Sequence, residues 1–151
     1  NAQDKWFEAV HFFRKAVEIY GENPEYWLAL GAAEYNVGNI VSSLEGYEKA
    51  SVLAPNNREV WLNWSIILHE QGNFEGAIDT IKNAIELNPD DAELHYRLCA
   101  YLLSAGKYRE AYNYLENALI LDFDKHKLLF EYFPELESQK ALARIIDQYR
   151  K

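Results

Sequence analysis

Two pairs of side chains in this sequence have the types and spacing from which a metal site could be built. His69 and Glu70 begin the pattern of zinc-dependent proteases, but Asn73 stands where the second histidine ligand must be. His95 and Cys99 are four residues apart, which places both on one face of a helix as half of a zinc site. Because zinc requires further protein ligands, we interpret this pair as packing residues.

The rest of the sequence lacks the motifs of common enzymes. It contains no Gly-rich phosphate loop, no dinucleotide-binding fingerprint and no nucleophile elbow. We therefore predict that the protein is not an enzyme, has no catalytic residues, and uses neither a cofactor nor a metal.

The same residue types recur along the chain with a period of 34 residues, and His69, His95 and Cys99 lie within this repeating pattern. Glycines, alanines and tryptophans mark the period: Gly38, Gly72, Gly106, Ala16, Ala50, Ala84, Ala118, Trp27 and Trp61. Each period contains two amphipathic helices, for example over 24–37 and 40–53, with a glycine between them. We expect this glycine to end the first helix with a positive φ, which other residues avoid.

Asparagines precede several of the expected helices. Asn39 and Asn73 stand before second helices, and Asn23 stands before Pro24, which suits the first turn of a helix. An asparagine oxygen at this position accepts a hydrogen bond from a free amide of the first turn. We predict that all three side chains act in this way.

Within each period the same residue types return at the same places. Residues 24–57 contain Trp27, Leu30, Gly31, Tyr47, Ala50 and Pro55. Residues 58–91 keep Trp61, Leu68, Ala77, Ala84 and Pro89, and residues 92–125 keep Leu98, Ala111, Leu115 and Ala118. This pattern resembles the tetratricopeptide repeat, a helix-turn-helix unit of about 34 residues. Seven residues depart from the family's pattern, namely Glu34, Ser43, Trp64, Ser65, His95, Cys99 and Phe123.

The resemblance implies an all-α fold, a right-handed α-solenoid of tetratricopeptide-like helix-turn-helix repeats. Leu136, Leu142, Ile145, Ile146 and Tyr149 form one apolar face near the end of the chain, which predicts a C-terminal capping helix. The expected parts of one continuous domain are the second helix of a truncated repeat (1–23), three repeats (24–57, 58–91 and 92–125), and a degenerate repeat with the capping helix (126–151).

The helix expected within residues 1–23 has an aromatic face that includes Trp6, Phe7, Phe12 and Phe13. A lone second helix leaves this face bare. We therefore expect the chain to be a fragment of a longer array, with binding at this edge as the alternative. Self-association through this helix is one form of such binding.

In tetratricopeptide proteins the first helices of successive repeats line a concave groove that holds a peptide or a helix of a partner. By register, the resemblance places these residues in the groove: Leu28, Tyr35, Asn36, Asn63, Ile66, His69, Tyr96, Arg97 and Ala100. Tyr35, Tyr96 and Arg97 are of the types that most often dominate binding energy. Asn63 and Arg97 match two of the five positions of the family's carboxylate clamp, but Glu93 replaces a clamp lysine, which disfavours acidic chaperone tails.

Charge and hydropathy restrict the partners further. Acidic side chains outnumber basic ones by 24 to 15, so a nucleic acid would be repelled. No stretch approaches the roughly 20 apolar residues that a membrane-spanning helix needs, so we expect no direct membrane insertion. The single cysteine excludes an internal disulfide and favours the cytoplasm, although a leader outside the sequence would allow a periplasmic or other soluble location.

These observations predict a non-catalytic protein-protein interaction scaffold that binds another protein in its concave groove. One alternative is the substrate- or partner-recognition region of a larger enzyme or signalling protein. The other is a self-assembling structural module.

Overall fold

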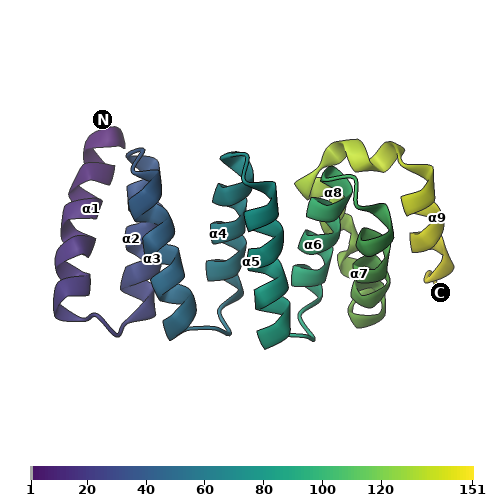
Figure 1. The fold of residues 1–151 in the computed structure, drawn as a ribbon, viewed down its shortest axis with the longest axis horizontal. Helices are drawn as coiled ribbons and strands as arrows, with labels where there is room; N and C mark the ends of the chain where they lie inside the picture. The colour runs from purple at the N-terminus through teal and green to yellow at the C-terminus, as the bar shows by residue number, and fades with distance from the viewer. Residues whose placement is uncertain (1) are drawn as a thin grey trace. The chain divides into compact units, whose positions relative to one another are not determined.

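The computed structural model describes residues 2–151, and the regular elements in this range are all helical (Figure 1). They are α1 (Ala2–Ile19), α2 (Pro24–Asn36), α3 (Ile40–Leu53), α4 (Arg58–Glu70), α5 (Phe74–Leu87), α6 (Ala92–Ser104), α7 (Tyr108–Leu121), η1 (Phe123–Lys127), α8 (Leu128–Tyr132), η2 (Pro134–Ser138) and α9 (Lys140–Gln148). None of the helices within 2–151 combines the length and apolar character needed to cross a membrane.

The chain divides into two compact units, which we describe separately. Unit 1 comprises residues 1–67 and unit 2 comprises residues 68–151, so the division falls inside α4. In unit 1, α2 packs against both α1 and α3. In unit 2, α6 packs against α5, α7 and α8.

Turns between paired helices are formed by the three glycines that recur with the period. Gly38, Gly72 and Gly106 have φ values of 88°, 82° and 76°, which confirms the prediction of a positive φ. No other described residue of the chain has a positive φ. Glycine adopts this conformation without steric cost, so the same tight turn recurs between α2 and α3, α4 and α5, and α6 and α7.

The predicted asparagine caps form in two cases out of three. Asn23 Oδ1 accepts a hydrogen bond from the Glu25 amide at 2.9 Å, and Asn73 Oδ1 accepts one from the Gly76 amide at 2.9 Å. Asn39 makes no side-chain cap, so the prediction for it is wrong. Its Nδ2 instead donates to Glu34 Oε2 at 2.8 Å, because that buried carboxylate needs a donor.

Two glycines bring the backbones of α2 and α3 into contact in unit 1. A Cβ atom at Gly46 would lie 3.1 Å from the Cα and N of Gly31 and from the Trp27 carbonyl oxygen. Ser43 Oγ donates to the Gly31 carbonyl at 2.6 Å. The ring of Tyr47 covers the same site and is only 3% exposed. Small residues therefore allow an approach that larger ones would prevent.

Glu34, which departs from the family's pattern, has a side chain that is almost fully buried between α1 and α2. Arg14 on α1 binds its Oε1 through both Nε at 2.8 Å and Nη2 at 2.7 Å. Together with the bond from Asn39, these contacts supply donors to both carboxylate oxygens. A buried carboxylate is costly without such partners, so Arg14 ties α1 to α2.

The C-terminal elements of unit 2 begin with a 3-10 turn that contacts α7 and end with α9. Leu136, Leu142 and Ile146 are buried, as the predicted apolar face requires. The Tyr149 hydroxyl donates to Glu116 on α7 at 3.2 Å. Between these elements, α8 runs alongside α6 (Figure 1).

We expect Arg14→Ala to lower the free energy of unfolding by about 2 kcal/mol, because it leaves the Glu34 carboxylate buried without its cation. Urea unfolding monitored by circular dichroism measures the change. Adding Glu34→Gln to Arg14→Ala should recover part of the loss by removing the charge.

Lys15→Ala is the matched control, since Lys15 is the exposed neighbour on the same helix. An equal loss in Lys15→Ala and Arg14→Ala would show that helix propensity, rather than the ion pair, sets the stability.

Candidate functional site

His95 and Cys99, the residues best placed for a metal site by sequence, are both buried in α6. Burial raises the pKa of the Cys99 thiol to about 12, which disfavours the thiolate that binds metals. Within residues 2–151, no three His, Cys, Asp or Glu side chains gather as metal ligands would. The interpretation as packing residues agrees with this environment.

His95 has a structural partner that explains its position in the repeat. Its Nε2 lies 2.8 Å from the Pro89 carbonyl oxygen, six residues earlier. Trp27 Nε1 donates to the Gly21 carbonyl at 2.8 Å and Trp61 Nε1 to the Pro55 carbonyl at 2.9 Å. With its Nε2 protonated, the imidazole therefore replaces the indole as the donor of an equivalent hydrogen bond.

In unit 1, the predicted groove residues lie on α2 and α4. The side chains of Leu28, Tyr35, Asn63 and Ile66 are partly exposed. Asn36 is exposed at the end of α2, where its Nδ2 donates to the Ala32 carbonyl at 2.8 Å and its own carbonyl accepts from Gln3 Nε2 at 3.2 Å. These first helices therefore offer a mixed apolar and amide surface.

In unit 2, two of the predicted groove residues do not reach the surface. Tyr96 and Ala100 have exposed fractions of 0%, so neither is available to a partner in this structure. The Tyr96 hydroxyl donates to the Asp122 carbonyl at 2.8 Å, and burial raises the pKa of the phenol. Besides α5 and α7, both η1 and α8 pack against α6, which the weak pattern of residues 126–151 did not indicate.

His69 and Arg97 come together through aromatic rings that the sequence analysis did not single out. The His69 ring stacks on Tyr101 with centroids 4.9 Å apart, and the Arg97 guanidinium carbon is 5.7 Å from the centroid of the same Tyr101 ring. Arg97 lies 3.6 Å from the ring centroid of Tyr132, and His69 lies 5.4 Å from that of Phe133. Pro134, which follows directly, was the one available signal that a helix ends there.

Two nitrogen atoms of this cluster lack a hydrogen-bond partner in the part of the chain that the structure describes. His69 Nε2 and Arg97 Nε are both buried, and neither has a partner within residues 2–151. Burial lowers the pKa of His69, and the nearby Arg97 cation lowers it further, against a smaller effect of Glu70. Burial also raises the pKa of Tyr132 to about 12. The imidazole and the phenol are therefore uncharged at neutral pH, and Arg97 is the cation of the cluster.

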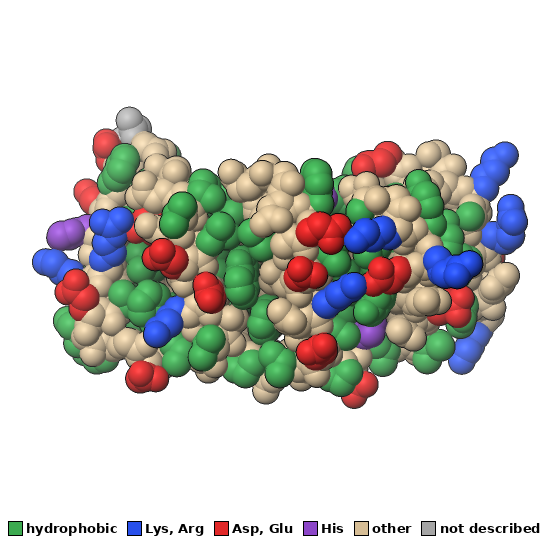
Figure 2. All heavy atoms as spheres, in the orientation of Figure 1, with side chains coloured by type: hydrophobic (Ala, Val, Ile, Leu, Met, Phe, Trp, Pro, Cys, Tyr) green, Lys and Arg blue, Asp and Glu red, His purple; other side chains and the backbone are tan. Residues whose placement is uncertain are grey.

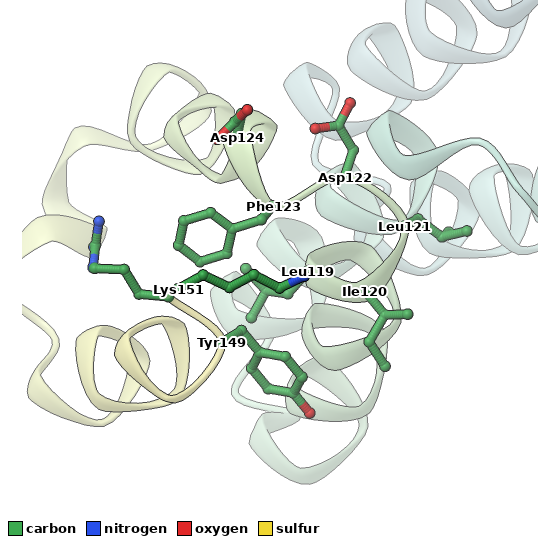
Figure 3. Close-up of a pocket in the computed structure, with 9 residues that line it drawn as sticks. Leu119, Ile120, Leu121, Asp122, Phe123, Asp124, Tyr149 and Lys151 are labelled. Atoms are coloured by element: carbon green, nitrogen blue, oxygen red, sulfur yellow. The ribbon is translucent and has the colours of Figure 1, made fainter.

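A cavity of about 710 Å³ lies at the C-terminal end of unit 2, between the end of α7, η1 and the residues after α9. In Figure 3 the rings of Phe123 and Tyr149 face it, with Lys151 between them. Arg150 pairs with Asp147 at 3.3 Å and lies 5.4 Å from the Phe123 ring. Basic side chains also gather over this end in Figure 2. The sequence analysis missed the cavity, because its walls come from segments about 30 residues apart.

Comparisons with known proteins agree with the resemblance drawn from the sequence. Residues 68–128 match the family model of the tetratricopeptide repeat. A crystal structure of MamA is 21% identical, covers 98% of this chain and 86% of its own, and superposes with a TM-score of 0.66. MamA from Desulfovibrio magneticus RS-1 is 18% identical, with coverages of 95% and 83% and a TM-score of 0.65. No curated protein matches the sequence. The predicted fold class, an all-α tetratricopeptide-like repeat fold, is confirmed.

We expect Tyr96→Phe to lower the free energy of unfolding by about 1 kcal/mol, since it removes the hydrogen bond to the Asp122 carbonyl and keeps the ring. Thermal and urea unfolding measure the effect. Tyr108→Phe, at a side chain that is 51% exposed, should change stability by much less. Equal stability of Tyr96→Phe and the parent would contradict a structural role for the hydroxyl.

Proposed function

Because the chain carries tetratricopeptide repeats, we propose that it is a non-catalytic scaffold that binds a peptide or a helix of a partner protein along its first helices. The partly exposed face of α2 and α4 carries this proposal. Leu28 and Ile66 are apolar but only partly buried, and Asn63 adds an amide on the same helix as Ile66. Apolar anchors with one or two polar groups are what an amphipathic or extended segment requires.

The partner's chemistry follows from these side chains. The chain's net charge of -9 disfavours a strongly acidic segment, and Leu28 and Ile66 favour apolar anchors. An amide such as Asn63 can donate to a backbone carbonyl of the bound segment and accept from its N–H. Tyr96 and Ala100 are excluded from the contact surface by their burial, whereas His69 and Arg97 remain partly exposed.

Leu28→Lys together with Ile66→Lys should abolish capture of the partner, because two lysines replace apolar anchors while their long stems still cover the helix surface. The control is Val41→Lys with Val52→Lys on α3, where both valines are more than 70% exposed. The measurement is affinity capture from the native lysate with mass spectrometry of the bound proteins. Circular dichroism melting checks that all variants fold.

A protein held by the parent and the α3 control but not by the α2/α4 variant supports the proposal. With that partner purified, we expect the dissociation constant to rise by at least about tenfold in the α2/α4 variant, or about 1.4 kcal/mol. Unchanged capture by this variant would contradict a binding face on the first helices.

Self-association is a second candidate, favoured by the aromatic surface of α1. Trp6, Phe7 and Phe12 are 38%, 55% and 61% exposed. The ring of Phe12 also packs edge-on against Phe13, with the two centroids 5.1 Å apart. Exposed apolar clusters of this kind occur at protein interfaces.

If α1 mediates self-association, the parent should show a mass that rises with concentration in light scattering, and Phe7→Lys with Phe12→Lys should be monomeric throughout. A parent that stays monomeric at the highest concentrations would remove this candidate without affecting the first.

A further inference from the structure

The inner face of α6 is covered by a short segment of its own chain. We call residues 128–133, which comprise α8 and Phe133, the α8 segment. It packs on α6, and Tyr96, Ala100 and Tyr101 are all buried at 2% exposure or less. Two of the three predicted partner positions on α6, Tyr96 and Ala100, are therefore buried within the molecule.

Three ring contacts, from Tyr132 and Phe133, and the fully buried side chain of Leu129 hold the α8 segment against the rest of unit 2. The guanidinium of Arg97 lies 3.6 Å from the ring centroid of Tyr132, which is a close cation-π contact. Phe133 contacts the rings of His69 at 5.4 Å and Tyr101 at 6.4 Å between centroids. The helix itself is only five residues long and its N-terminus has no side-chain cap. Such a short helix depends on its docking contacts for stability.

His69 is enclosed by rings from three other elements. Tyr101 of α6 stacks on it, Phe74 of α5 meets it edge-on at 4.8 Å, and Phe133 lies against it at 5.4 Å. The charged groups that act on it are the Arg97 cation from α6 and Glu70 from its own helix. Its buried Nε2 has no hydrogen-bond partner within residues 2–151.

We propose that the α8 segment is a latch over the inner face of α6 that opens when His69 takes up a proton. An imidazolium carries a hydrogen on both ring nitrogens, so in the charged form the buried Nε2 is a donor, and it has no acceptor within residues 2–151. The new charge also lies near the Arg97 cation, which repels it. Moving Phe133 away hydrates the imidazolium, and Phe133 directly follows a helix of only five residues, whereas Tyr101 and Phe74 belong to the longer helices α6 and α5.

The direction of the pH dependence follows from the pKa of His69, which is lowered from 6.5 in the closed state by burial and by Arg97. Above pH 6.5 the imidazole is neutral whether the latch is open or closed, so the closed state carries no cost. As the pH falls below 6.5, the open state binds the proton first, and opening becomes more favourable.

Opening would expose the ring of Tyr101, which Phe133 contacts and which is only 2% exposed in the closed state. If the scaffold function proposed above is correct, mild acid would therefore enlarge the surface available to a partner. This consequence rests on the proposed function, but the latch itself does not.

Hydrogen exchange with mass spectrometry tests the latch without a partner, so its failure would leave the scaffold proposal standing. Peptides covering 128–138 are compared with peptides covering 111–119 of α7, between pH 7.5 and pH 5.5 after correction for intrinsic exchange. In the parent, we expect protection of 128–138 to fall by at least about threefold at low pH, and protection of 111–119 to stay unchanged.

His69→Phe keeps an aromatic ring and cannot be protonated, so its protection of 128–138 should not depend on pH. His69→Gln serves the same purpose with a polar side chain, and melting curves show which of the two folds. A pH response in either folded variant equal to that of the parent would overturn the proposal. So would a parent whose 128–138 protection does not change, or whose α7 loses protection in parallel.

Discussion

One hydrogen bond, repeated with the period of the chain, fixes how each first helix starts. The side chains of Trp27, Trp61 and His95 each pair with a backbone carbonyl six residues earlier. That carbonyl follows the end of the preceding second helix, where it has no partner within a helix. The bond therefore sets the direction in which the chain re-enters the stack, and the same side chain fills the space beside the turn. The paired helices pack on each other only when each first helix starts in this direction.

Three residues that depart from the repeat pattern, Glu34, Ser43 and His95, each form a hydrogen bond or an ion pair in the structure. Glu34 brings a charge into the core of unit 1, and Arg14 and Asn39 neutralise and bind it. Ser43 donates to the Gly31 carbonyl at a place where the backbones are in contact. His95 is smaller than the tryptophan it replaces but keeps a ring nitrogen for the shared bond. Each substitution is local, because its partners lie in the same or the adjacent repeat.

Much of the fold could be predicted from the sequence, because it depends on short-range rules. The expected helices at 24–37 and 40–53 are observed at Pro24–Asn36 and Ile40–Leu53. The turn glycines were identifiable because positive φ is a property of single residues. The cap at Asn39 was not predictable in this way, since its side chain responds to a carboxylate that becomes buried only after folding.

The candidate site was less predictable for a related reason. The position of a residue within the repeat predicts the face of its own helix on which the side chain lies. It does not predict whether another segment covers that face. The helix α6 has the predicted positions, yet Tyr96 and Ala100 are fully buried, and η1 and α8 pack against this helix. Tyr132 and Phe133 carry no repeat pattern that would have indicated their contact with Arg97 and His69. Packing of an irregular terminal segment depends on the assembled helices beneath it.

The contact between His69 and Phe133 has a consequence for the order of folding. It joins residues 64 positions apart, whereas the ion pairs of Lys107 with Glu75 and of Lys125 with Glu93 join residues 32 apart. Closing the longer loop in an unfolded chain costs more entropy, but the helices between the two rings shorten it once they have formed. The contact between His69 and Phe133 therefore forms at a lower entropic cost once the helices from α5 to α7 are in place.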